Sequence, residues 1–155
     1  MDHGFGNWPT HHALRNADRI AYIDGPDGVE YRWRDVEEHT NRLADALNRR
    51  GIQHGDRVAL LTHNSPQMME LFFAIAKLGA IAVPVNWRLH PREINYILND
   101  SGAITLFHSE AFGDTARAAM DLGTPVRFTV EVSRSALRTN GHRLSALSAT
   151  LGGFG

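Results

Sequence analysis

Four short apolar segments, separated by stretches of helical length, occupy residues 57–130, and this alternation limits the possible fold more than any other feature. The segments are RVALL (57–61), IAVPV (81–85), ITLF (104–107) and VRFTV (126–130). Short continuous apolar runs are typical of strands buried on both faces, as the strands of parallel sheets are. Strands that alternate with helices predict a doubly wound, mainly parallel α/β sheet flanked by helices.

The helices expected between these strands span residues 65–78, 91–99 and 109–123. In the first of them, Ser65 can cap the helix and Pro66 loses no hydrogen bond at the first helical position. Apolar residues cover most of this helix, and its other side chains share one narrow seam: Gln67, Glu70, Ala74 and Lys77. A helix of this kind must be covered on more than one side, so we expect it to be largely buried, with Phe72 in the core.

The residues before the first strand predict a helix (5–15), a hairpin (19–32) and a second helix (33–50). The hairpin is indicated by the turn sequence GPDG between two short apolar segments. In the second helix, four residues recur at helical spacing and lie on one face: Val36, Thr40, Leu43 and Leu47. Gly51 is well placed to end this helix.

Composition excludes several classes of function. The chain has 155 residues, a formal net charge of -1 and no cysteine. There is therefore no disulfide, thiolate metal site or thiol nucleophile, and no overall charge that would attract nucleic acid. The N-terminus lacks the basic start and apolar run of a secretion signal, so we expect a cytoplasmic protein.

A membrane-spanning segment is not predicted, although Met68 to Val85 is largely apolar. Charged residues, a glycine and a proline interrupt this stretch, whereas a spanning helix needs about 20 mostly apolar residues. After residue 131 the composition changes to a Ser-, Ala- and Arg-rich sequence. We therefore expect one α/β subdomain (1–131), followed by a divergent tail, linker or truncated end (132–155).

The common catalytic motifs are missing. The sequence has no G-x-x-x-x-G-K-[ST] phosphate loop, no G-x-G-x-x-G, no G-x-S-x-G and no H-E-x-x-H. Nine histidines are scattered along the chain, and only His11 and His12 are close in sequence. Adjacent residues on a helix diverge by about 100°, so this pair cannot easily share an ion and no metal site is predicted.

The best candidates for a binding role follow two of the predicted strands. His63 and Asn64 come after RVALL, and Asn86 and Arg88 come after IAVPV. Ligands of open α/β sheets gather beyond the carboxyl ends of strands. Arg88 can hold an anion or anchor a loop, and Asn64 can instead be a cap or turn residue. These four residues are candidate contacts for a ligand, and no catalytic residue is predicted.

One long segment resembles the adenylate-forming (AMP-binding) acyl-CoA synthetases. It reads DRVALLTHNSPQMMELFFAIAKLGAIAVPVNWRLHPREINYILNDSGA, and ADRIAYIDG, YRWRDVEEHTNRLADAL and RGIQHGDRVALL precede it in the family's order. The resemblance covers about Trp8 to Phe107, and VPVNWRLHPREINYILNDSGA is most similar to bacterial fatty-acid-CoA ligases. His90 stands where the family usually has Ser or Thr, so weaker helix capping is expected there.

The resemblance implies a reaction of two steps. A fatty or aryl carboxylate attacks the α-phosphate of Mg-ATP to give an acyl-adenylate and pyrophosphate, and the thiol of CoA then displaces AMP. In this family the phosphate loop, the nucleotide motif, the hinge aspartate and the lysine of a C-terminal lid all lie beyond the matched region. The resemblance therefore implies the N-terminal part of a ligase, which on its own binds none of ATP, Mg²⁺ or CoA and is inactive.

A second interpretation stays open. The chain can be a non-catalytic remnant that acts as a binding or interaction module, for example by pairing with a full-length ligase. An exposed sheet edge or an uncovered apolar helix face would favour this interpretation, because such surfaces mark interaction sites and permit self-association.

Overall fold

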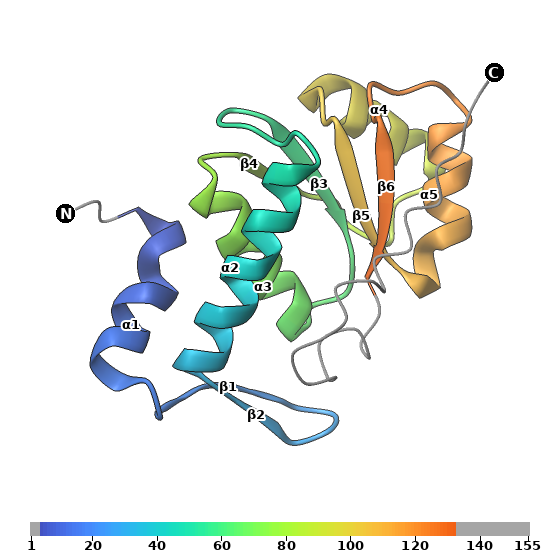
Figure 1. Ribbon diagram of the computed structural model, residues 1–155. Helices are drawn as coiled ribbons and strands as arrows, with labels where there is room; N and C mark the ends of the chain where they lie inside the picture. Colours follow the sequence, from blue (N-terminus) through green and yellow to red (C-terminus); the bar gives the residue numbers. More distant parts are fainter. Residues whose placement is uncertain (1–3, 133–155) are drawn as a thin grey trace. The chain divides into compact units, whose positions relative to one another are not determined.

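The computed structural model describes residues 4–132, and these residues form two compact units (Figure 1). Unit 1 contains the described residues up to Gly55 together with Asn64–Ile81, and unit 2 contains Asp56–His63 together with the described residues from Ala82 onward. Residues 133–155, which make up nearly all of the tail expected from the sequence, lie outside the described residues.

A four-stranded sheet is the centre of unit 2. Its strands stand in the order β4 (Ile81–Pro84), β3 (Arg57–Leu61), β5 (Thr105–Ser109) and β6 (Phe128–Val132). β5 pairs in parallel with both β3 and β6, with Leu60 opposite Phe107 and Phe107 opposite Val130. The predicted mainly parallel sheet flanked by helices is therefore confirmed, and its first three predicted strands are neighbours.

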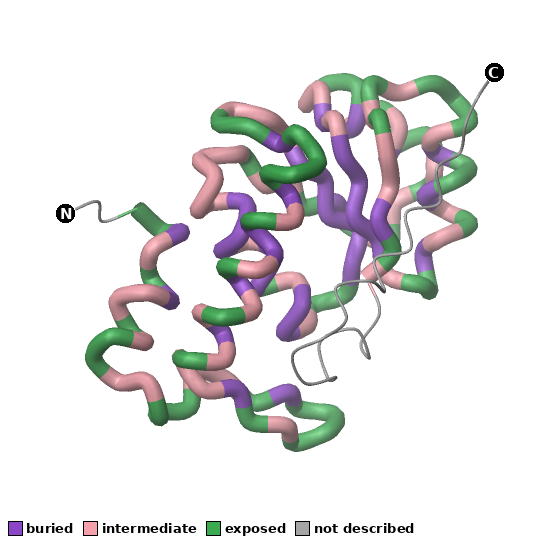
Figure 2. Tube along the Cα trace, in the orientation of Figure 1, coloured by how far each residue is buried: buried purple, intermediate pink, exposed green. Residues whose placement is uncertain are grey.

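Two helices of unit 2 pack on one face of this sheet, namely α4 (Pro91–Ser101) and α5 (Gly113–Met120). A short 3-10 helix, η2 (Glu110–Phe112), joins β5 to α5. The core between the sheet and the two helices contains Ala59, Leu61, Val85, Ile94, Leu98, Ala103, Leu106, Phe112, Ala116 and Ala119. Figure 2 shows this burial as continuous stretches along the inner strands.

The start of α4 differs from the expectation of weaker capping. Nδ1 of His90 accepts a hydrogen bond from the Arg92 N–H at 3.3 Å, and the Glu93 carboxylate accepts one from the His90 N–H at 2.8 Å. The histidine ring thus takes the place of a hydroxyl in a reciprocal cap, because its unprotonated nitrogen is an acceptor.

Unit 1 is built from helices and one antiparallel hairpin. Its elements are η1 (Phe5–Asn7), α1 (Trp8–Asn16), β1 (Ile20–Asp24), β2 (Val29–Arg32), α2 (Trp33–Arg49) and α3 (Pro66–Lys77). The predicted helices and hairpin are confirmed, and all four residues of the predicted apolar face of α2 are buried. Gly51 has a φ of +84°, which ends α2 in a conformation that favours glycine.

Helix α3 is largely buried, as predicted, but the buried surface also includes its polar seam. Ser65 Oγ accepts the Met68 N–H at 3.2 Å, as expected for the cap. Phe72 is only partly buried and Met69 is 44% exposed, so placing Phe72 in the core was wrong. The polar seam is inside as well: Gln67, Glu70 and Ala74 are all buried. The reason is that Glu70 and Lys77 pair with polar side chains of α2.

Within residues 4–132, none of the helices combines the length and the apolar character needed to cross a membrane.

Candidate functional site

Residues that follow three strands of the unit 2 sheet bring their rings together. His63 comes after β3, Trp87 after β4, and Phe112 ends η2 after β5. The ring centroids of His63 lie 4.8 Å from Trp87 and 4.7 Å from Phe112, and those of Trp87 and Phe112 are 5.8 Å apart. We call these three residues the aromatic cluster. It lies where the carboxyl ends of parallel strands meet, which is the usual place for ligands in open α/β sheets.

The exposure of the three side chains increases from the interior to the surface. Phe112 is buried and belongs to the core beneath the sheet, Trp87 is partly buried, and His63 is exposed. The planes of Trp87 and Phe112 are nearly parallel, at 21°, whereas His63 meets Trp87 edge-on at 64°. The rings of Trp87 and Phe112 therefore form a base that presents the imidazole of His63 to solvent, where it can donate or accept a hydrogen bond.

Arg88 adds a positive charge beside the cluster. Its guanidinium lies 4.1 Å from the centre of the Trp87 ring, an arrangement that favours a cation. The Arg88 N–H donates to Asn86 Oδ1 at 3.0 Å, which fixes the turn after β4. Among the described residues Arg88 has no carboxylate partner. Its exposed charge is therefore held in place and remains available to an anion.

The structure brings together only some of the residues that the sequence predicted. His63 and Arg88 meet through Trp87, and Asn86 supports the turn that carries Arg88. Asn64 is exposed and belongs to unit 1, and Ser65, one residue later, caps α3 in its place. Sequence reasoning missed Phe112. The available signal was an aromatic residue soon after a predicted strand, at the edge where His63 and Arg88 were expected.

Metal binding has no support within the part of the chain that the structure describes. No group of three or more His, Asp or Glu side chains there could hold a metal ion. Neither His63 nor the described Asp and Glu residues of unit 2 belong to such a group.

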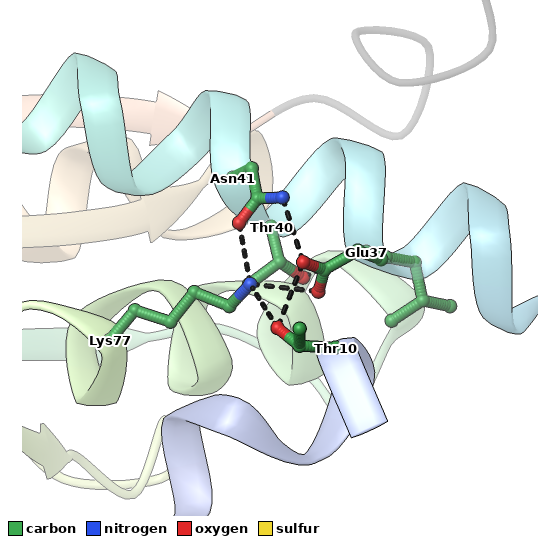
Figure 3. A network of polar contacts seen from close by, with 6 residues as sticks. Thr10, Glu37, Thr40, Asn41 and Lys77 are labelled. Atoms are coloured by element: carbon green, nitrogen blue, oxygen red, sulfur yellow. Dashed lines mark hydrogen bonds and ion pairs between the residues drawn. The ribbon is translucent and has the colours of Figure 1, made fainter. Parts of the chain in front are cut away.

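A second polar group lies in unit 1 and joins three helices (Figure 3). Lys77 Nζ on α3 donates to Glu37 Oε2 of α2 at 2.8 Å, to Asn41 Oδ1 of α2 at 2.5 Å and to Thr10 Oγ1 of α1 at 3.2 Å. Thr10 and Asn41 each also donate to Glu37 Oε1 at 2.8 Å. Every member has a partner within the group. We name these four residues the three-helix network.

The three-helix network changes the titration of its carboxylate. Burial alone would raise the pKa of Glu37, but hydrogen bonds from Lys77, Asn41 and Thr10 outweigh it and lower the pKa. Only 11% of the Lys77 side chain and 18% of the Glu37 side chain are exposed. The charge of Glu37 is paired with that of Lys77, and Lys77, Asn41 and Thr10 donate hydrogen bonds within unit 1. We therefore interpret this network as structural.

Comparisons with known proteins agree on one family. The sequence model of the AMP-binding enzyme family matches residues 9–147, which extends beyond the segment that carried the resemblance. The chain is 36% identical over 115 residues to a feruloyl-CoA synthase of an Amycolatopsis species, covering 74% of this chain and 23% of that protein. It is 41% identical over 104 residues to the long-chain-fatty-acid–CoA ligase FadD13 of Mycobacterium tuberculosis, covering 65% of this chain and 21% of that protein.

A solved structure gives the same result for the fold. The inhibitor-bound N-terminal domain of FACL13 from Mycobacterium tuberculosis matches with a TM-score of 0.80 and 33% identity, covering 88% of this chain and 35% of that chain. The chain thus spans less than a quarter of the length of the two curated relatives named above.

Proposed function

Because the chain belongs to the AMP-binding enzyme family, we propose that it forms the N-terminal scaffold of an acyl-CoA ligase, which joins a carboxylic acid to CoA with the conversion of ATP to AMP and pyrophosphate. The observation that carries the proposal is the match to the N-terminal part of such ligases in both sequence and fold. The family match and the solved domain each include residues of both units.

The chemistry explains why a scaffold of this kind needs further residues. A carboxylate is a poor electrophile. When its oxygen attacks the α-phosphate of ATP, pyrophosphate leaves and a mixed anhydride forms, from which AMP leaves readily. That step builds charge at phosphorus, which oriented donors and a cation must stabilise. We infer that ATP and Mg²⁺ are bound by residues of the complete ligase other than those described here, and that the 155-residue chain alone is inactive.

The acid is proposed only as a class. The relatives are named for long-chain fatty acids and for ferulate, so both aliphatic and aromatic carboxylates fall within the proposal. On this chain, the exposed Arg88 is the proposed contact for an anionic group of a bound substrate, with His63, Asn64 and Asn86 as neighbouring polar candidates. We assign none of these residues a catalytic role.

A second candidate function is a non-catalytic interaction module. Unit 1 favours it, because apolar side chains of its first elements are exposed: Phe5 by 46%, Trp8 by 52% and Leu14 by 80%. Such side chains can contact another protein or a second copy of the chain.

A segment exchange tests the ligase proposal. In the M. tuberculosis FadD13 ligase, the aligned N-terminal segment is replaced by residues 9–147 of this chain, and acyl-CoA formation is measured with a long-chain fatty acid. We expect the chimera to retain activity, because the two segments share one fold and much of their sequence. The matched control is the host ligase with the segment deleted, which should be inactive. A folded, soluble chimera without activity would contradict the proposal and favour the interaction module.

A further inference from the structure

Glu70 on α3 is a fully buried carboxylate with an uneven set of partners. Its side chain has 0% exposure. One oxygen, Oε1, accepts a hydrogen bond from the Tyr22 hydroxyl at 2.9 Å and lies 3.0 Å from Nδ1 of His39. The other oxygen, Oε2, is buried and has no hydrogen-bond partner. Tyr22 lies on β1 and His39 on α2, so the three side chains join three elements of unit 1.

His39 supplies the positive charge that compensates the buried carboxylate of Glu70. A buried carboxylate is costly unless a positive charge and hydrogen bonds compensate it. Within the described residues the ion pair of Glu70 is with His39, whose side chain is 21% exposed. The Tyr22 hydroxyl supplies a hydrogen bond but no positive charge. When His39 is neutral, the carboxylate keeps hydrogen bonds at Oε1 but loses its counter-charge.

The carboxylates around His39 favour its protonated imidazole. Its hydrogen bond with Glu70 is the main cause of a raised pKa of His39, which burial opposes and the charges of Glu70, Asp35 and Glu38 support. Burial, followed by the charge of Glu70, raises the pKa of Tyr22, with smaller effects from Tyr31 and Asp35. Tyr22 therefore remains a donor, and protonation of His39 is favoured by its hydrogen bond to Glu70.

The same residues anchor the hairpin. Tyr22 pairs with Tyr31 across β1 and β2, and their rings stack at 4.9 Å. Tyr31 is buried in a small core with Val36 of α2 and Phe73 of α3. A change at Glu70 thus acts on the place where the hairpin and both helices meet.

We propose that His39, Glu70 and Tyr22 form a pH-responsive latch that holds the β1–β2 hairpin and α2 on α3 while His39 is protonated. The contribution of the latch to stability is complete below the ordinary pKa of histidine, 6.5. It is lost as the pH rises through the higher pKa of the folded state, because a neutral His39 leaves a buried charge uncompensated. Unit 1 therefore loosens on the alkaline side.

The first test is an NMR titration of the histidine rings in the full chain. We expect His39 to titrate above 6.5 in the wild type and lower in Glu70→Gln, because the amide keeps the shape of the side chain but removes the charge. His90, a cap residue in unit 2, is the matched control, and its ring signals should be the same in both proteins. A wild-type His39 that titrates at or below 6.5, or that is unaffected by Glu70→Gln, would overturn the latch.

The second test measures stability against pH with His39→Gln, whose amide can still donate a neutral hydrogen bond to Glu70. In urea unfolding, the wild type should be the more stable protein at about pH 6, and its advantage should vanish by about pH 9. Amide protection at Tyr22 and Tyr31, relative to α5 in unit 2, should fall over the same interval. A stability difference between the wild type and His39→Gln that does not change with pH would overturn the latch, because the contact of His39 with Glu70 would then be only structural. If the variant does not fold, the wild-type titration of His39 decides.

Discussion

At the residue scale, Gly6 is a position in unit 1 where the backbone of a neighbouring helix leaves no room for a side chain. Gly6 is buried in η1, directly against the end of α3. A Cβ placed there would collide with the Lys77 backbone nitrogen and would lie 2.6 Å from the Ala76 carbonyl carbon. Backbone atoms cannot rotate away as a side-chain tip can. The close approach of η1 to α3 therefore depends on glycine at this position.

We expect Gly6→Ala to lower the free energy of unfolding by about 1–3 kcal/mol, since the extra methyl group overpacks a backbone contact. Urea unfolding followed by circular dichroism measures the change. Gly25→Ala is the matched control, because a Cβ at Gly25 would meet nothing within 4 Å and its φ is not in the left-handed region. Equal midpoints for the two variants would show that η1 does not pack on α3 in solution.

Single residues also show where sequence reasoning succeeded and failed. His63 and Arg88 could be predicted, because the position of a residue after a strand is visible in the sequence. Phe112 was missed although it follows a predicted strand, and the pairing of Glu70 with His39 could not be predicted. One acidic residue on an otherwise apolar helix does not reveal whether it faces water or a partner, and its partner, His39, is 31 residues away in the chain. Only the packed helices bring the two together.

At the element scale, most boundaries followed from local signals. Helix α3 begins after Ser65 and α2 ends before Gly51, as capping and backbone chemistry indicate. The last strand was predicted over 126–130 but spans Phe128–Val132. The pairing with β5 begins at Phe128, opposite Thr105, so Val126 belongs to the connection although it packs against the core. An apolar residue in a loop looks like a strand residue when only the sequence is known.

The three-helix network gives an element-scale prediction. Lys77→Met keeps much of the side-chain volume but leaves Glu37 without its cation, so we expect a loss of about 1–3 kcal/mol at neutral pH. Because the pKa of Glu37 is lowered in the folded state, the contribution is present above the ordinary value of 4.5 and is lost as the pH falls through the lower folded value. The difference between wild type and variant should shrink in acid.

The control for Lys77→Met lies on α2 itself. Glu38 pairs with Arg42 one turn away, and both side chains are well exposed. Glu38→Ala should therefore cost about 0.5 kcal/mol or less. Denaturant titrations of both variants at neutral and acidic pH give the comparison. A Lys77→Met loss as small as that of Glu38→Ala would show that the network contributes little beyond a surface ion pair.

At the scale of the whole molecule, neither unit is a continuous piece of the chain. The chain passes from one unit to the other after Gly55, after His63 and after Ile81. As a result α3 belongs to unit 1, although it connects β3 and β4 of the unit 2 sheet. The family and the parallel sheet could be predicted from the order of the segments. The division into units could not, because it depends on long-range contacts that no local pattern records.

The last prediction concerns the purified 155-residue chain. With ATP, Mg²⁺ and a fatty or aromatic acid we expect no acyl-adenylate, and no acyl-CoA when CoA is added. Adenylation builds charge at the α-phosphate, and stabilising it calls for a row of backbone donors and a cation. The sequence contains no phosphate-loop motif, and the described residues contain no cluster of acidic or histidine side chains for a metal.

Pyrophosphate release and a hydroxylamine trap for activated acyl groups measure the adenylation step, with the M. tuberculosis ligase as the positive control. Background hydrolysis of ATP is separated from adenylation by requiring that turnover depend on the acid. The variants His63→Ala and Arg88→Ala are assayed beside the wild type, because these residues lie together at the carboxyl edge of the sheet. Acid-dependent turnover that either substitution abolishes would place an active site at the aromatic cluster and would make this chain an enzyme in its own right.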